Sequence, residues 1–408
     1  MTTNHRLRRS AVAAGLVGVL ALTAACGSSS AKDEGEGPIK LGVALALTGP
    51  AAATADWARM GVELSVKQVN EAGGINGRQV EAVYADTELN PTKAVTVVNR
   101  LINQDKVDLI IGPLTSDETL ATLPMTTKAN IASINGSGSE ITPEVAPYSF
   151  AMLMNAEDQA KKMVDYAKTT YKASSVATIN YSGTQGKAAA KSFKKALADH
   201  GMSEASSQEF DVPVTDLTPQ LLNMRKSNPD VLLSFNQTGN DTARLVLGLR
   251  ELNWDIPVIG SYGSTFASQA KAVAGPDTFK GLKSVTWSAF SACTANDIRP
   301  ASTAFVGAVK SQFDEKRTAN AAMDYVAEYR DALFLLKAGV EGSGSTAGDK
   351  VAGWLETDGA KASVDLNLVH QGYAMSKDNH FLMDTSSLTL VDAGEELAPG
   401  IVRRLDCN

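Results

Sequence analysis

The sequence predicts an α/β protein built from doubly wound parallel sheets. Short apolar runs recur along the chain, and each ends at glycine, proline or small polar residues. Stretches with one apolar face at helical spacing alternate with these runs. The alternation restarts once, which gives two successive blocks between residue 39 and about residue 285. Strand–helix–strand order supplies the crossover helices that parallel strands need, so each block predicts one sheet covered by helices.

The first block contains four predicted strands and three predicted helices. Glycines at 73, 74 and 77 end the first helix, and Pro91 stands where the second helix would begin. The predicted strands cover residues 39–47, 80–85, 107–111 and 131–134. The predicted helices cover residues 57–70, 91–102 and 118–129.

The second block repeats this order, and a less regular segment follows it. Its predicted strands cover 176–180, 207–212 and 231–235, with a further strand beginning at 258. Its predicted helices cover 185–200, 219–227 and 241–252. After the block we expect a helix over 321–338 and short strands near 372–375 and 380–383.

The N-terminal segment has the order of a secretory signal. Three arginines precede an apolar run over residues 11–25, and small residues lead into Cys26. The run is too short for a membrane span, so residues 1–25 are predicted to be a signal peptide. Residues 22–26 also resemble the lipobox of bacterial lipoproteins, although Thr23 stands where that motif has leucine. The resemblance implies a lipidated Cys26 on the outer face of the cytoplasmic membrane; the alternative is an ordinary signal peptide with a coincidental cysteine.

Residues 26–38 predict a flexible tether, because they are small, polar and acidic and cannot bury apolar area. The whole chain carries a formal net charge of −7 and has no basic run, which argues against nucleic acid as a partner. In an oxidising compartment we expect Cys293 and Cys407 to form a disulfide; the alternative is two buried free thiols.

Several motifs stand together in the order of one known family. GVELSVKQVNEAGGINGRQVE begins at Gly61, DTELNPTKAVTVVNRL at Asp86 and IIGPLTS at Ile110. The "NEAGGINGR" and "NPTKAV" blocks together are specific. The chain therefore resembles the solute-binding proteins of branched-chain amino-acid importers, the leucine/isoleucine/valine-binding type.

The resemblance implies the type I periplasmic-binding fold, in which two α/β lobes are joined by three chain crossings. We expect crossings near Leu153, Val285 and Met383. Lobe 1 then comprises residues 39–153 plus 286–383, and lobe 2 residues 154–285 plus 384–408. The family implies a monomer that captures a small-molecule solute by hinge closure and delivers it to the permease and ATPase subunits of an ABC importer, without a cofactor.

Three serines follow the third and fourth predicted strands, where the ends of parallel strands meet. Ser116 matches the family serine that holds the ligand carboxylate. Ser137 and Ser139 match positions whose main-chain carbonyl and hydroxyl take part in binding. Helix starts after such loops suit anions. The alternative is that residues 136–139 are only a turn of small residues.

Further contacts are expected from both lobes. Gln185 falls where amino-acid binders often place tyrosine, and Phe235 lies in the loop after a lobe 2 strand. Thr54 takes another family tyrosine position, and Trp57 lies one turn beyond it. Trp57 is either an apolar wall of the site or a core residue.

One position departs from the family pattern. Tyr262 stands where amino-acid binders carry the glutamate that pairs with the ligand ammonium. A buried ammonium without a carboxylate partner is costly, so this difference weakens the α-amino-acid interpretation. A phenol suits a carboxylate, hydroxyl or aromatic ligand. Another carboxylate could take the place of the missing glutamate, and the candidates are Asp117, Glu118, Glu140 and Asp241.

Two other classes of protein are the alternatives to a solute-binding transporter component. An enzyme is disfavoured, because the histidines lack metal-ligand spacing and no nucleophile-elbow, dinucleotide or phosphate-loop motif occurs. No metal site is predicted. A ligand-sensing receptor module of the same fold, feeding a membrane signalling protein, stays open as the alternative to a transporter component.

Overall fold

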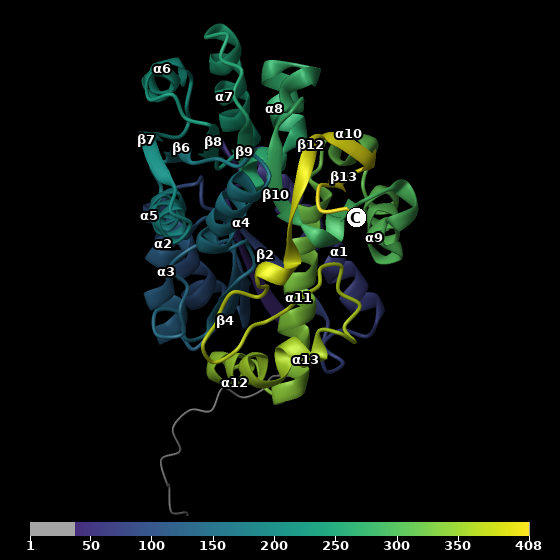
Figure 1. The fold of residues 1–408 in the computed structure, drawn as a ribbon. Helices are drawn as coiled ribbons and strands as arrows, with labels where there is room; N and C mark the ends of the chain where they lie inside the picture. The colour runs from purple at the N-terminus through teal and green to yellow at the C-terminus, as the bar shows by residue number, and fades with distance from the viewer. Residues whose placement is uncertain (1–36, 408) are drawn as a thin grey trace, which may run out of the picture. The chain divides into compact units, whose positions relative to one another are not determined.

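The structure is a computed structural model that describes residues 37–407. The predicted signal peptide, Cys26 and the tether up to residue 36 lie outside the described residues. Residues 37–407 form one compact unit with two β-sheets, each flanked by helices (Figure 1).

The first sheet is fully parallel, with the strand order β2-β1-β3-β4-β5. Its strands are β1 Ile39–Leu45, β2 Val80–Asp86, β3 Leu109–Ile111, β4 Ala132–Asn135 and β5 Ser149–Ala151. Four of these strands confirm the prediction within a few residues, and β5 is additional. β3, β4 and β5 are buried along their whole length, as parallel strands covered on both faces require.

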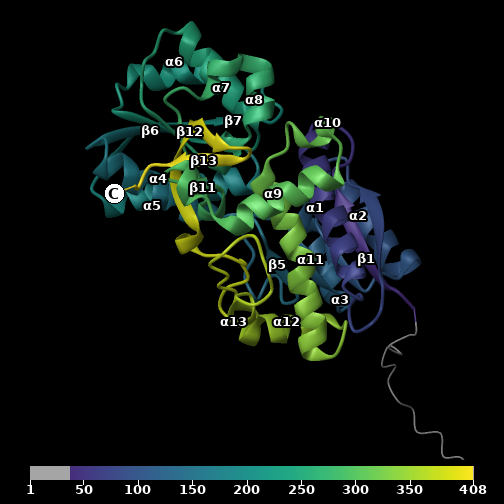
Figure 2. The same cartoon turned by 90° about the vertical axis from the view of Figure 1, so that its right-hand side faces the viewer.

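Helices that cover this sheet come from two distant parts of the chain: α1 Ala52–Glu71, α2 Pro91–Arg100, α3 Ser116–Lys128, α11 Met323–Ser343 and α12 Gly348–Trp354. Asn90 caps α2 by accepting the Lys93 N–H, and Pro91 follows it as expected. α11 runs beside α1 (Figure 2). Gly61 permits this close packing, because a Cβ there would lie 2.3 Å from the Val326 carbonyl oxygen.

The second sheet is mixed and has the order β11-β13-β12-β10-β9-β8-β6-β7. Its strands are β6 Ser175–Tyr181, β7 Ser203–Phe210, β8 Val231–Phe235, β9 Val258–Gly260, β10 Lys283–Trp287, β11 Ser291–Ala292, β12 Leu388–Ala398 and β13 Ile401–Arg404. The first five are mutually parallel, which confirms the doubly wound α/β class. β12, yellow in Figure 1, lies beside β10 and runs antiparallel to it.

The sequence did not predict β12 or β13, and the strands that it predicted near 372–375 and 380–383 are wrong in kind. Those residues form only isolated bridges, Tyr373 with Met383 and Phe381 with Ala151. The pairing of β12 with β13 contains two register shifts. Because of them, the sequence of β12 does not alternate regularly between apolar and polar residues, which is the pattern that would have predicted a strand.

The remaining helices are α4 Ala156–Thr169, α5 Thr184–Asp199, α6 Thr218–Lys226, α7 Gly239–Glu251, α8 Ala267–Ala274, α9 Pro300–Gln312, α10 Glu315–Thr318 and α13 Ala360–Ala362. Short 3₁₀ or π turns cover Leu101–Asp105, Tyr262–Thr265, Pro276–Phe279, Ser288–Phe290, Ala295–Asp297, Leu355–Gly359 and Thr385–Ser387. α7 begins with a capping box in which Thr238 and Asp241 satisfy each other's backbone N–H groups.

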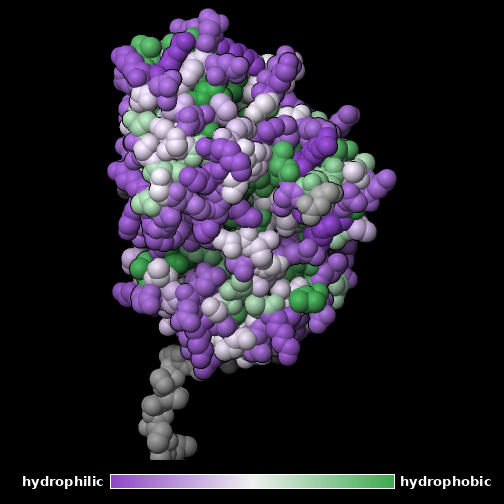
Figure 3. Space-filling model, in the orientation of Figure 1, coloured by the Kyte–Doolittle hydropathy of each residue, from purple (hydrophilic) through white to green (hydrophobic). Residues whose placement is uncertain are grey.

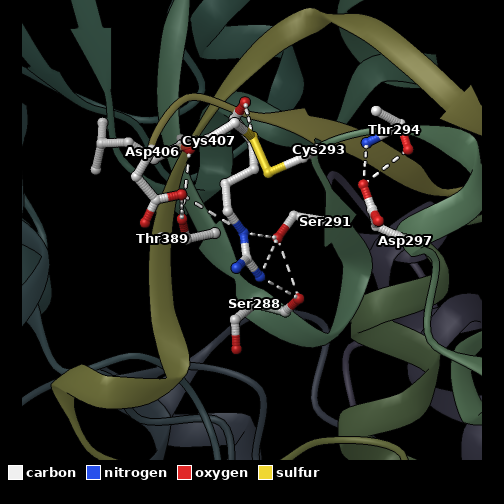
Figure 4. Close-up of polar contacts among 10 residues, drawn as sticks. Ser288, Ser291, Cys293, Thr294, Asp297, Thr389, Asp406 and Cys407 are labelled. Atoms are coloured by element: carbon white, nitrogen blue, oxygen red, sulfur yellow. Dashed lines mark hydrogen bonds and ion pairs between the residues drawn. A yellow bond between two sulfur atoms is a disulfide. The ribbon is translucent and has the colours of Figure 1, made fainter.

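Cys293 and Cys407 form the predicted disulfide, with their Cα atoms 5.6 Å apart across a sequence separation of 114 (Figure 4). Arg404 reinforces the junction, because its Nη2 donates to the Ser288 carbonyl oxygen at 3.2 Å and lies 3.2 Å from Ser291 Oγ. The end of the chain is therefore fastened beside β11.

The exact lobe boundaries remain a proposal. α11, from the segment assigned to lobe 1, packs on the first sheet, whereas β11 from that segment pairs with β13 in the second. The face seen in Figure 3 is mainly hydrophilic, with hydrophobic residues in scattered groups. Within residues 37–407, no helix has both the length and the apolar character of a membrane span.

Candidate ligand-binding site

A cavity of about 360 Å³ lies where the carboxyl ends of strands from both sheets meet. Leu114 and Gly136, beyond β3 and β4, line it from the first sheet. Tyr181 and Phe235, the last residues of β6 and β8, line it from the second. Doubly wound sheets bind ligands at this edge, and the volume is within the range of small-molecule sites.

Five buried aromatic residues line the cavity and form what we call the aromatic wall: Tyr181, Phe235, Tyr262, Phe266 and Tyr325. Three of the rings pack edge to face, with centroids 5.3 Å apart for Tyr262 and Phe266 and 5.6 Å for Phe266 and Tyr325. The other two, Tyr181 and Phe235, are stacked with centroids 6.4 Å apart. Such packing holds the rings rigidly, so the wall is a preformed apolar surface.

The three predicted serines come together, but behind the cavity. Ser137 Oγ lies 2.9 Å and Ser139 Oγ 3.2 Å from Ser116 Oγ, and the Gly138 N–H donates to that same oxygen at 3.2 Å. Each serine is at most 4 % exposed, and none of them lines the cavity. Their hydroxyls satisfy one another in this arrangement, and their role in carboxylate binding stays a prediction.

Gln185 lines the cavity from the start of α5 and approaches the serines. Its Oε1 accepts the Tyr181 hydroxyl at 3.1 Å, and its Nε2 donates to the Met154 carbonyl oxygen at 3.4 Å. A Cβ at position 138 would lie 1.8 Å from that Nε2, so glycine there lets the carboxamide occupy this position. Gln185 therefore contacts the segment that carries the serines.

Tyr262 belongs to the aromatic wall, but its hydroxyl is buried without a hydrogen-bond partner. Burial, and next the negative charge of Asp324, raises the pKa of this phenol. Burial likewise raises the pKa of Asp324 to about 6, and it raises the pKa of Glu328, which accepts the Trp287 indole N–H. Tyr262 thus offers its ring to the cavity, while its hydroxyl faces buried acids.

Of the two α1 residues predicted to contact the ligand, only one lines the cavity. Thr54 lines the cavity, and its Oγ1 accepts from Gln269 Nε2 at 2.9 Å. Trp57 is buried outside the lining, with its ring edge to face with Phe266 and Tyr325 at 5.4 and 6.4 Å. In this arrangement Trp57 supports the aromatic wall from behind.

Among the described lining residues, Asp241 is the only carboxylate and Arg244 the only Lys, Arg or His. Asp241 accepts the backbone N–H groups of Gln237 and Thr238 at 3.1 and 2.8 Å, and burial raises its pKa to about 6. The sequence did not single out Arg244. It follows Asp241 by three residues on α7, which was the available signal.

The chemistry of the site is that of recognition. Residues 37–407 contain no group of three His, Cys, Asp or Glu side chains placed to hold a metal ion. A concave, mainly apolar cavity with a few polar groups, lined from two doubly wound sheets, defines a protein that binds small solutes.

The comparisons with known proteins give the family. A model described as periplasmic binding protein matches residues 38–396, and the chain belongs to that family. The "Leu/Ile/Val-binding protein homolog 3" of Brucella melitensis is 25% identical over 60% of this chain and 72% of its own length. The "Leucine-, isoleucine-, valine-, threonine-, and alanine-binding protein" of Pseudomonas aeruginosa is 23% identical over 77% of this chain and 81% of its own.

Solved structures share the fold. The Streptococcus pneumoniae protein LivJ in complex with isoleucine has a TM-score of 0.71 at 20% identity, and the match covers 90% of this chain and all of that one. A Rhodopseudomonas palustris ABC-transporter solute-binding protein in complex with 3,4-dihydroxybenzoic acid has a TM-score of 0.70 at 18% identity, covering 87% and 92%. The type I periplasmic-binding fold is confirmed. The family consists of non-enzymatic solute-binding proteins with an extracytoplasmic location, so the prediction that the chain is not an enzyme is confirmed.

Proposed function

We propose that this protein is the solute receptor of an ABC importer and captures a small carboxylate-bearing solute between its two lobes. The observation that carries the proposal is the cavity lined from both sheets at the carboxyl ends of their strands. A ligand that contacts both lobes favours their closed arrangement, and the closed form would be the one that docks on the permease and ATPase subunits.

The lining favours an aliphatic or aromatic acid over an α-amino acid. Tyr262 replaces the family glutamate, and the one lining carboxylate, Asp241, already accepts two backbone N–H groups. Asp117 is likewise engaged, because it accepts the Thr184 N–H. At the cavity surface a ligand ammonium would therefore lose its water without meeting a carboxylate that is free of hydrogen-bond partners. The aromatic wall instead suits an apolar body.

The proposed place of action is the outer face of the cytoplasmic membrane. The lipobox-like segment ending at Cys26 supports a diacylated anchor, and two acyl chains give stable attachment. The acidic tether would then let the solute-binding body reach its membrane partners.

A thermal-shift panel on the soluble protein from Lys32 onward tests the proposal. One half of the panel holds amino acids, and the other holds unaminated aliphatic and aromatic acids. A ligand at 100 times its dissociation constant adds about 2.7 kcal/mol, which raises the melting temperature by a few degrees. We expect the unaminated acids to raise it most. A response to leucine, isoleucine or valine alone would contradict the unaminated-acid assignment. No response in either half would contradict carboxylate capture and direct the search to other solutes such as amides, or to a sensing role.

A further inference from the structure

We propose that Arg244 binds the anionic group of the solute at the open end of the cavity, while the apolar body of the solute lies against the aromatic wall. The inference rests on the proposed function of solute capture and deepens it: it names the residue that selects for negative charge and the orientation of the bound solute.

Arg244 lines the cavity and has no hydrogen bond or ion pair to any residue in 37–407. Two carboxylates lie near it in the fold, and both already serve helix starts. Asp241 accepts the Gln237 and Thr238 N–H groups at the start of α7. Asp216 accepts the Thr218 N–H at 2.8 Å. This hydrogen bond is the main cause that lowers the pKa of Asp216, and the positive charge of Arg244 is a weaker one. The guanidinium therefore keeps its five donors for a ligand.

No competing cation lines the cavity within the described residues. At the serine end, the hydroxyls of Ser116, Ser137 and Ser139 bond to one another and lie outside the lining. Gln185, which covers that segment, offers a neutral carboxamide. A carboxylate at the serine end would have to break existing hydrogen bonds, whereas one at Arg244 would meet free charged donors. Hydrogen bonds between a charged guanidinium and a carboxylate are stronger than hydrogen bonds between neutral groups.

The burial of the lining residues sets the orientation. The aromatic wall is buried, whereas Arg244 is half-buried and Val273, another lining residue, is 38% exposed. Partly exposed Leu89 and Val214 also line the cavity. Leu89 is held at φ 55°, a left-handed conformation that costs free energy for leucine and is typical of ligand clamps. An elongated anion thus finds apolar surface inside and a cation beside the opening.

The test uses isothermal titration with 3-phenylpropanoate, 4-methylpentanoate and 3,4-dihydroxybenzoate, each paired with its neutral primary amide. The proteins are the wild type, Arg244→Gln and Lys226→Gln. Lys226 is an exposed cation on α6 outside the lining, so its substitution changes the net charge equally without touching the cavity. Melting temperatures without ligand establish that all three proteins fold.

We expect the wild type to bind at least one acid more tightly than its amide. Arg244→Gln should weaken that acid roughly tenfold or more and its amide less than about twofold, and it should flatten the salt dependence of acid binding. Lys226→Gln should leave both affinities unchanged. Wild-type affinity for the acid in Arg244→Gln, or an equal loss for acid and amide, would overturn the role of Arg244 but leave solute capture standing. Failure of the wild type to bind any of the three acids would overturn the inference, and binding of amino acids instead would show that capture itself survives.

Discussion

Buried carboxyl groups on α11, outside the cavity lining, make the stability of the protein depend on pH. Glu328 is fully buried, accepts the Trp287 N–H and has a raised pKa, chiefly from burial and next from the charge of Asp324. A raised carboxyl pKa means that the folded protein holds a proton that the unfolded chain has released. The free energy of unfolding therefore falls as the pH rises from the ordinary carboxyl pKa through the raised value.

Glu328→Gln should remove that part of the pH dependence. The neutral amide can keep the bond to Trp287, so we expect unchanged stability near about pH 3, where the carboxyl is largely protonated in both the folded and the unfolded protein, and a gain that grows toward about pH 8. Urea unfolding at several pH values measures the free energy of unfolding of each protein and hence its pH dependence. Glu81→Gln, on the exposed side of β2, serves as the control and should parallel the wild type. Parallel curves for Glu328→Gln and the wild type would contradict a buried protonated acid at this position.

At the scale of elements, the disulfide fastens the short strand β13 to the β11 segment. Cys293 and Cys407 close a loop of 114 residues, and Arg404 bonds to Ser288 and Ser291 beside them. None of these residues lines the cavity. The double substitution Cys293→Ala, Cys407→Ala should lower the free energy of unfolding by about 2–4 kcal/mol and leave solute affinity within about twofold. Urea unfolding and titration calorimetry check the two statements, and a matching loss of affinity would show that the C-terminal strands shape the cavity.

How far the sequence predicts these elements depends on their environment. β1, β3 and β8 carry continuous apolar runs because both faces are covered, so they were predictable. The exposed, bulged half of β12 offers no such period. The clustering of Ser116 with Ser139 follows from their places after neighbouring parallel strands. For Arg244 the only signal was its position three residues after Asp241 on α7, and helical periodicity does not distinguish a polar residue facing a cavity from one facing solvent.

At the scale of the whole molecule, side-chain hydrogen bonds join helices of the two proposed lobes near the cavity. α5 has Gly183 as its N-cap residue and no side-chain cap of its own. Asp117, from the first turn of α3, supplies it by accepting the Thr184 N–H at 3.3 Å and the Thr184 hydroxyl. The Thr54–Gln269 hydrogen bond is a second bridge. On the proposed hinge mechanism, such bonds exist only while the lobes are together, so they help to set the closed population.

Asp117→Ala should therefore weaken solute binding although Asp117 lies outside the cavity lining. Loss of a helix cap costs about 0.5–2 kcal/mol, which corresponds to roughly a 2- to 30-fold loss of affinity if the cap forms only on closure. The loss should appear as faster solute release in stopped-flow measurements, because the bridge stabilises the bound form after encounter. Asp378→Ala, which removes an exposed carboxylate outside the lining, is the control. Unchanged release from a folded Asp117→Ala protein would mean that the cap persists in the open form and does not report closure.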